Sequence, residues 1–251
     1  MSIRATYVGH ATVLIELAGV RILTDPVLRP LVFGIVKRAG VPPASIDPPP
    51  DAILISHQHP DHLDPPSLRM LGSATPTIAP RGSGRRLRRS GMRAVQELAP
   101  GESTRIGEVE IVATPADHDG RRLPIGRRTE ALGFELRGGG RRVYFAGDTD
   151  LFDEMAALAG VDLAFLPIGG WGPHIGAGHL DPERAARAAA VIRPRAVVPI
   201  HWGTMLRADL HRHRPELLHE PAAEFRARMA LLAPDVDAQV LEPGESFELA
   251  P

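Results

Sequence analysis

The sequence has 251 residues, a formal net charge of −1 and no cysteine. The lack of cysteine excludes disulfides, thiolate metal ligands and a cysteine nucleophile, and the near-neutral charge gives no sequence-independent attraction to nucleic acid or anionic membranes. The first seven residues lack the apolar stretch of a signal peptide, and no segment approaches the about 20 apolar residues that a membrane-spanning helix needs. We therefore expect a soluble cytoplasmic protein.

The first 24 residues alternate between short apolar runs and turns, which predicts a meander of antiparallel strands. These strands are expected at 6–8, 13–15 and 20–23. A proline-rich connection then runs to Pro50. Its apolar segment 31–36 could form a flap over a pocket that binds an apolar substrate or lipid, although such a segment more often packs into the core.

Metal-binding residue types follow the next apolar run, at 53–55, which predicts a short buried strand. The pattern H-x-H-x-D-H is formed by His57, His59, Asp61 and His62. Imidazole nitrogen and carboxylate oxygen hold zinc-like ions, and this segment offers more of them than one tetrahedral ion can use. It therefore indicates half of a two-metal site; a solvated polar turn is the alternative.

The remaining chain alternates strands and helices without a repeat or a linker, so we expect a single domain covering 1–251. Strands are expected at 77–79, within 95–115, at 131–136, 142–145, 162–166 and 196–200, and near 238–241 and 246–249. Helices are expected at 65–71, 151–158, 181–192 and 222–232, with a glycine-rich loop at 169–178. The arginines between 81 and 93 fit the solvated face of a helix, because no interleaved aromatic residues offer a stacking platform for nucleic acid.

Several apolar runs end shortly before residues that can carry chemistry. They are the runs at 53–55, 111–113, 143–145, 163–166 and 197–200, followed by His57, His118, Asp148, the glycine-rich loop and His201, respectively. Runs of this kind suit interior strands that are covered on both faces. In such folds the carboxyl ends of the strands gather at one edge, where ligands bind. We therefore expect these residues to converge.

Seven residues resemble, in order and approximate spacing, the metal-ligand pattern of the metallo-β-lactamase superfamily. They are His57, His59, Asp61, His62, His118, Asp148 and His201. Further segments look like landmarks of the same family, namely 9–12, 23–26, 167–170 and 201–204. The resemblance covers nearly the whole chain. It implies an α/β fold of the α+β type, a four-layer αββα sandwich with metals at the edge between its two sheets.

Within this superfamily the chain looks most similar to the branch of the N-acylphosphatidylethanolamine-hydrolysing phospholipase D and the L-ascorbate-6-phosphate lactonase. Segments 179–183 and 201–204 are more like the phospholipase. The resemblance implies two divalent ions, zinc or alternatively manganese or iron, and a hydroxide shared between them that attacks a phosphorus or carbonyl centre. It assigns the first ion to His57, His59 and His118, the second to Asp61, His62 and His201, and a bridging position to Asp148.

Other residues could act around these ligands. Asp61 could instead remain partly free and shuttle a proton, and His179 resembles a histidine that contacts substrate or protonates the leaving group. Asp25 could hydrogen-bond a ligand histidine. Candidates for substrate contact are Trp171 and the arginines Arg121, Arg122, Arg127 and Arg128, whose guanidinium groups suit phosphate unless they are ordinary solvated side chains. Of the remaining histidines, we expect a packed structural role for His10, exposure for His211 and His213, and either role for His174.

Three functions remain open from the sequence. The leading hypothesis is a binuclear metal-dependent hydrolase acting on a phosphodiester, and the second is a lactonase or other carboxylic ester hydrolase. The third is a non-catalytic metal-binding protein, against which the presence of all seven ligand residues argues. The expected partner is a small-molecule ester or phosphodiester. Nucleic acid is not expected, whereas membrane contact and oligomerisation stay open.

Overall fold

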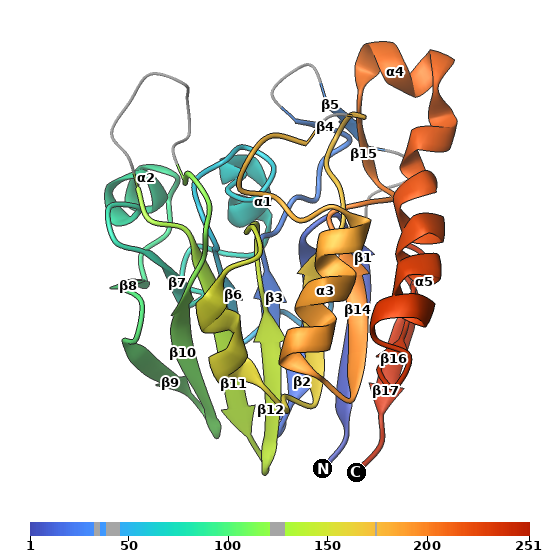
Figure 1. Cartoon of the computed structure of the whole chain (residues 1–251). Helices are drawn as coiled ribbons and strands as arrows, with labels where there is room; N and C mark the ends of the chain where they lie inside the picture. Colours follow the sequence, from blue (N-terminus) through green and yellow to red (C-terminus); the bar gives the residue numbers. More distant parts are fainter. Residues whose placement is uncertain (33–35, 39–45, 121–128, 174) are drawn as a thin grey trace.

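The computed structural model describes residues 1–32, 36–38, 46–120, 129–173 and 175–251, and within them two seven-stranded sheets dominate the fold (Figure 1). The first sheet has the order β17-β1-β2-β3-β6-β7-β8 and the second the order β16-β14-β13-β12-β11-β10-β9. The strands of the first are β1 (Ile3–Gly9), β2 (Thr12–Leu17), β3 (Val20–Thr24), β6 (Ala52–Leu54), β7 (Thr77–Pro80), β8 (Val95–Leu98) and β17 (Ser246–Leu249). Those of the second are β9 (Ser103–Ile106), β10 (Val109–Pro115), β11 (Leu132–Gly138), β12 (Arg141–Phe145), β13 (Leu163–Pro167), β14 (Ala196–Ile200) and β16 (Asp237–Ala238).

The two sheets pack face to face through one continuous apolar core, and helices cover their outer faces. Strand β6 is apolar throughout because both of its faces are buried. Ala52 and Leu54 belong to the core between the sheets, whereas Ile53 packs on the helical side. Helices α1 (Pro65–Met70) and α2 (Gly84–Arg89) cover the first sheet, and α3 (Pro182–Ile192) and α5 (Glu220–Leu232) cover the second. The predicted four-layer sandwich is therefore confirmed.

Aspartate and proline together determine where α1 and α3 begin. Asp64 accepts a hydrogen bond from Ser67 N at 3.1 Å, and Asp181 accepts one from Arg184 N at 2.7 Å. In both helices proline occupies the first turn, where its missing N–H costs nothing. The histidine-rich segment leads directly into α1, and the glycine-rich loop leads into α3. These caps therefore fix where both segments end.

The predicted antiparallel meander is confirmed. Strands β12, β13 and β14 pair in parallel, and some helices differ from expectation. The segment expected as a helix at 151–158 forms a 3₁₀ helix, η1 (Asp153–Leu158), in which the buried Met155 and Leu158 are three residues apart, the period of that helix. The arginine-rich helix is shorter than expected, because Gly82 and Gly91 on either side adopt positive φ.

A small third sheet lies over the end of the sandwich that carries the site. It consists of β15 (Met205–Arg207), β5 (Val36–Arg38) and β4 (Leu31–Val32), and β15 leads into α4 (Ala208–His213) and η2 (Pro215–Leu218). Within the segment expected as a flap or core element, Val32 packs with Val27 and Met205, whereas Leu31 is exposed. Residues 33–35 lie outside the described residues, and a substrate-binding role for this segment stays a prediction.

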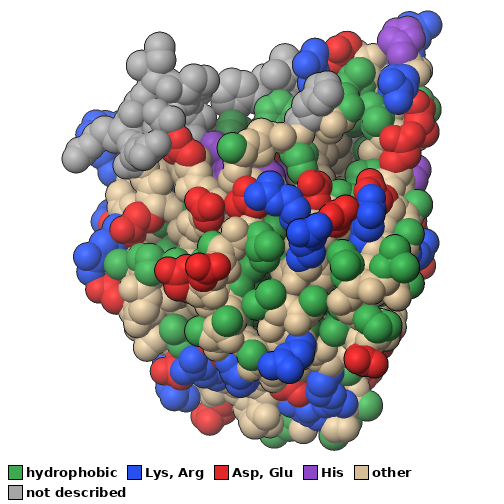
Figure 2. All heavy atoms as spheres, in the orientation of Figure 1, with side chains coloured by type: hydrophobic (Ala, Val, Ile, Leu, Met, Phe, Trp, Pro, Cys, Tyr) green, Lys and Arg blue, Asp and Glu red, His purple; other side chains and the backbone are tan. Residues whose placement is uncertain are grey.

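The outer surface shows mixed charge. On the face drawn in Figure 2, basic and acidic side chains alternate over the body of the sandwich, with hydrophobic side chains scattered among them. As far as the described residues form it, this face has no continuous basic stripe of the kind that tracks a nucleic-acid backbone. None of the helices in the described segments combines the length and apolarity needed to traverse a lipid bilayer.

Candidate metal centre

The chemistry-bearing residues meet at one end of the sandwich because the strands that precede them all end there. Backbone pairing with β7 continues for one residue beyond β6, because Ile55 N donates to Ile78 O. The histidine-rich segment starts directly afterwards. Asp148 follows β12 and His201 follows β14, two strands of the parallel part of the other sheet. The loops of both sheets lie together at the upper end in Figure 1. The predicted convergence is confirmed.

One group of four side chains could hold a metal ion. It comprises His57, His59, His118 and Asp148, whose ligand atoms all lie within 4.8 Å of one another. Nε2 of His118 lies 3.2 Å from Nδ1 of His59, and Nε2 of His57 lies 3.8 Å from Oδ2 of Asp148. These are the three histidines that the resemblance assigned to the first ion.

A second group of four lies beside the first and is entirely buried. It comprises His10, Asp61, His62 and His201, again with ligand atoms within 4.8 Å of one another. Nε2 of His62 and Nε2 of His201 lie 3.1 Å apart, and Oδ2 of Asp61 lies 3.5 Å from the latter atom. Three of the four were expected. His10 was expected as a packed residue, and burial together with the neighbouring His201 lowers its pKa to about 3, so its ring is neutral.

One carboxylate oxygen connects the two groups. Oδ2 of Asp148 lies 3.8 Å from Nε2 of His57, 3.1 Å from Nε2 of His62 and 3.3 Å from Nε2 of His201. Among the described residues, Nε2 of His57 and Oδ1 of Asp148 are buried without a hydrogen-bond partner. Buried polar atoms of this kind are costly unless something binds them. Nitrogen and carboxylate oxygen donors left unpaired in this way fit a bound divalent cation.

The ring nitrogens that face away from the two groups are held by hydrogen bonds. Nδ1 of His62 donates to Oδ2 of Asp25 at 2.7 Å, and Nδ1 of His201 donates to the carbonyl of Gly169 at 2.7 Å. Nδ1 of His118 lies 2.8 Å from the carbonyl of Gly178. A proton fixed on Nδ1 leaves Nε2 with a free lone pair, which is how proteins prepare histidine for metal binding.

Burial and the carboxylates of Asp61 and Asp148 make the two groups electrostatically different. Burial lowers the pKa of His57 well below its usual value, so this imidazole is neutral. Burial disfavours charge on His201 too, but attraction to Asp148 and a hydrogen bond to Asp61 raise its pKa to about 9. The pKa of His62 is also raised, because the same two carboxylates outweigh its burial. The second group therefore stabilises positive charge, and a divalent cation held there would supply that charge in place of the protons on Nε2 of His62 and His201.

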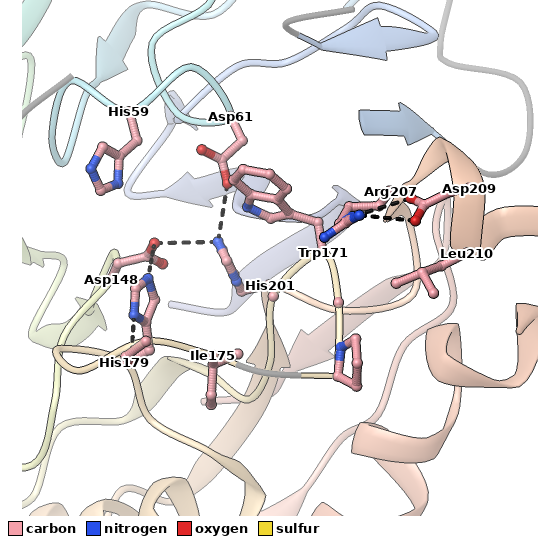
Figure 3. Close-up of a pocket in the computed structure, with 14 residues that line it drawn as sticks. His59, Asp61, Asp148, Trp171, Ile175, His179, His201, Arg207, Asp209 and Leu210 are labelled. Carbon is pink, nitrogen blue, oxygen red and sulfur yellow. Dashed lines mark hydrogen bonds and ion pairs between the residues drawn. The ribbon is translucent and has the colours of Figure 1, made fainter. Parts of the chain in front are cut away.

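A cavity of about 450 Å³ opens directly onto both groups (Figure 3). Its wall includes His59, Asp61, Asp148 and His201 from the two groups, and Gly170, Trp171, Gly172, Pro173, Ile175, Gly176, His179, Arg207, Asp209 and Leu210 from the glycine-rich loop and the β15–α4 region. Figure 3 shows the ring of Trp171 between the two groups and the side chain of Arg207. His179 projects into the cavity, with Nε2 3.5 Å from Oδ2 of Asp148 and Nδ1 3.1 Å from the carbonyl of Gly176.

The structure brings some of the other candidates to the site and leaves others outside the described residues. Trp171 and His179 line the cavity, and the roles expected for them in substrate contact stay predictions. Arg121, Arg122, Arg127, Arg128 and His174 lie outside the described residues. His213 is exposed as expected, whereas His211 is half-buried.

The sequence did not indicate the part of the cavity wall formed by Arg207, Asp209 and Leu210. Nothing in the spacing of these residues marks them. They reach the cavity because Arg207 N donates to the carbonyl of Trp171 at 3.0 Å, which joins β15 to the glycine-rich loop.

The chain is similar to known proteins in sequence and in fold. The family model described as a beta-lactamase superfamily domain matches residues 20–202. A metal-dependent hydrolase from Opitutus terrae is 33% identical over 258 residues, covering 98% of this chain and 100% of the relative. An N-acyl-phosphatidylethanolamine-hydrolyzing phospholipase D from Caenorhabditis elegans is 34% identical over 226 residues, covering 80% of this chain but 64% of that longer relative. The solved structure of a metallo hydrolase from Ignicoccus hospitalis has the same fold, with a TM-score of 0.73 at 24% identity, covering 100% of this chain and 99% of the other.

Proposed function

The chain belongs to the metallo-β-lactamase superfamily and is a metal-dependent hydrolase, and we propose that it uses two divalent metal ions to cleave a phosphodiester bond in a small molecule. The observation that carries the two-ion proposal is the position of Asp148, whose Oδ2 faces one histidine of the first group and two of the second. A single carboxylate shared in this way is the usual bridge of a two-metal hydrolase.

In this proposal each group holds one ion. His57, His59 and His118 hold the first, Asp61, His62 and His201 hold the second, and Asp148 belongs to both. Zinc fits this donor set, and manganese and iron are the alternatives. Such ions, when bound, supply Lewis-acid chemistry: they lower the pKa of a water molecule toward about 7 and neutralise charge on the reacting phosphoryl group.

His179 is the proposed proton donor to the leaving group. Its side chain is 19% exposed, so it is open to the cavity, and Nδ1 is anchored on the carbonyl of Gly176. Burial tends to lower its pKa, but the hydrogen bond and charge of Asp148 outweigh this and raise it, so the ring can hold a proton at Nε2. Asp61 is less suited to this role, because Nε2 of His10 lies 2.9 Å from its Oδ2 and holds it within the second group.

The cavity wall opposite the metal centre supports a substrate with an apolar part and a negative charge. Trp171, Ile175 and Leu210 form its apolar side, and Arg207 provides the positive charge. Arg207 is paired with Asp209, but both side chains are more than half exposed. An exposed pair of this kind is weak, so an anionic substrate can compete for the guanidinium group.

The phosphodiester rather than the carboxylic ester is favoured by two observations. The name of the Caenorhabditis elegans relative describes a phospholipase D, an enzyme that cleaves a phosphodiester bond. In addition, the arginine on the cavity wall suits a phosphate oxygen. This chain spans 64% of the length of that relative, so phosphodiester cleavage by this chain is a proposal.

The test is an activity comparison with defined metal content. The purified protein is stripped with a chelator, reloaded with zinc or manganese, and assayed on bis-p-nitrophenyl phosphate and on a panel of lactones. We expect diesterase activity that chelation abolishes and metal restores. Activity confined to lactones would replace the proposal by the lactonase alternative, and the absence of any metal-dependent turnover would favour a non-catalytic role.

A further inference from the structure

His10 occupies an unusual backbone position at the edge of the second group. It follows β1 in the turn to β2 and has φ of 58°, next to Gly9 at 129°. Positive φ is uncommon for residues other than glycine; histidine, asparagine and aspartate adopt it more often than the rest, at a cost of about 1 kcal/mol or more. A residue kept in this conformation with a fully buried side chain needs contacts that compensate.

Within the described residues, the side-chain hydrogen bond and the ring pairs of His10 go to the second group. Nε2 of His10 lies 2.9 Å from Oδ2 of Asp61, and the ring centroids of His10 and His201 are 3.9 Å apart. The carbonyl of His10 accepts a hydrogen bond from His201 N at 2.8 Å. His10 therefore holds one member of this group through its side chain and another through its backbone. The ring of His10 also lies beside that of His62, the remaining member of this group, with 5.6 Å between the centroids.

We propose that His10 is a positioning residue that fixes the carboxylate of Asp61 and thereby sets the affinity of the second group for its metal ion. The inference rests on the proposed two-metal function and goes beyond the seven expected ligands. A carboxylate can rotate between metal-facing and solvent-facing positions. A hydrogen bond from Nε2 of His10 removes that freedom, in the way that outer partners of metal ligands generally raise affinity.

The geometry favours this role over direct metal binding by His10. A separation of 2.9 Å between Nε2 and Oδ2 is a normal hydrogen-bond length, and an ionised carboxylate can only accept. The proton of the imidazole must then be on Nε2, the atom that faces the group. A protonated nitrogen has no lone pair for a metal.

Two amide substitutions test the hydrogen bond to Asp61 separately from the ability of residue 10 to adopt positive φ. In H10Q the side-chain amide reaches the position of Nε2 and can donate to Asp61. In H10N the amide corresponds to Nδ1 and falls short of Asp61, although asparagine tolerates positive φ better than most residues. H10A removes the side chain altogether. The melting temperature of each metal-free variant verifies that it folds.

The experiment is a titration of the metal-free full chain with Co²⁺, followed by visible absorbance and by competition with a chromogenic chelator. We expect two ions to bind to the wild type. We expect H10N and H10A to bind the second ion about 10–100-fold more weakly and the first ion unchanged, and H10Q to stay within about threefold of the wild type.

Three results would overturn the inference while leaving the proposed function intact. They are a second ion bound by H10N as tightly as by the wild type, an H10Q variant as weak as H10A, or an equal loss of both ions. A wild-type protein that binds fewer than two Co²⁺ ions would instead overturn the two-metal proposal, and with it the role of His10.

Discussion

Asp25 and His62 form a fully buried pair in which Oδ2 of the aspartate accepts a hydrogen bond from Nδ1 of the histidine at 2.7 Å. The same carboxylate accepts two further hydrogen bonds from Ser56, from its backbone N at 2.7 Å and from its hydroxyl at 2.6 Å. Asp25 therefore connects the end of β3 to the histidine-rich segment and fixes the ring that faces His201. This contact matches the role expected for Asp25.

Replacing Asp25 with asparagine should weaken metal binding. The amide nitrogen of D25N cannot accept a hydrogen bond, so either Ser56 or His62 loses its partner. We expect the affinity for zinc to fall about 10–100-fold, measured by competition with a chromogenic chelator. The exposed Asp235 provides the control, because D235N should leave the affinity unchanged. Equal affinities for D25N and the wild type would show that the ring of His62 needs no anchor.

Removing the imidazole of His179 should affect substrates according to their leaving group. Glutamine cannot donate an acidic proton, so H179Q should slow the hydrolysis of an alkyl diester about 100-fold or more. A p-nitrophenyl diester, whose leaving group departs as a stable anion, should be slowed much less. Steady-state kcat for the two diesters, with H213Q as the surface control, tests this. An equal loss on both substrates would assign His179 to structure or to metal binding instead.

Arg207 should discriminate between charged and neutral substrates. We expect R207Q to raise KM for an anionic phosphodiester about tenfold, the order of magnitude of one lost charge-assisted contact, and to leave KM for a neutral lactone unchanged. D209N is the matched variant, because it releases Arg207 from its ion pair without removing the positive charge. It should leave KM for the diester unchanged or lower it. A rise in KM for both substrates with R207Q would indicate a change in cavity shape.

Much of this site could be predicted because its signals are local. The histidine-rich segment lies in one stretch of six residues, and Asp148 and His201 each follow an apolar strand closely. The order of strands then brings them to one edge by a general property of sheets with parallel strands. Neither step needs knowledge of a contact between particular distant residues.

The rest depends on non-local contacts that leave no local pattern. Strand β15 has three residues and exists because Met205 to Arg207 pair with β5, far away in the sequence. Likewise, the contact of His10 with Asp61 joins two loops, and a histidine after a strand does not reveal its partner. The sequence therefore indicated the metal-facing side of the cavity and Trp171 on the opposite wall, and missed the part of that wall formed by Arg207, Asp209 and Leu210.

The backbone before Asp148 should tolerate only glycine. Gly147 has φ of 63°, and a Cβ there would lie 2.5 Å from Cβ of Ser56. Gly140 has a similar φ of 74° but has open space around it. We expect G140A to lose about 1–2 kcal/mol from backbone strain alone, and G147A to lose about 1–3 kcal/mol more from overpacking. Urea unfolding of the metal-free proteins measures both, and equal losses would show that the Ser56 contact can relax.

Glu135 should make stability depend on pH in the acid range. Its carboxylate is buried in β11, 2.6 Å from both Arg137 and Arg142. Burial tends to raise the pKa of Glu135, but the hydrogen bonds from the two arginines outweigh it, and the pKa lies below its usual value. A carboxyl whose pKa is lowered by folding stabilises the protein above the pKa of the unfolded chain, about 4.3, and loses that contribution as the pH falls through the lower, folded value.

The measurement is the difference in unfolding free energy between the wild type and E135Q in urea at a series of pH values. We expect the wild type to be more stable by about 1–3 kcal/mol at pH 7, because E135Q replaces a buried charged acceptor with a neutral amide whose nitrogen cannot accept a hydrogen bond from either arginine. The difference should stay constant down to about pH 4.3 and shrink below it. E224Q is the control, because Glu224 pairs with Arg228 on the exposed face of α5, where such pairs contribute little. A difference for E135Q that does not change with pH would mean that the wild-type carboxyl is already protonated, or that the loss comes from packing.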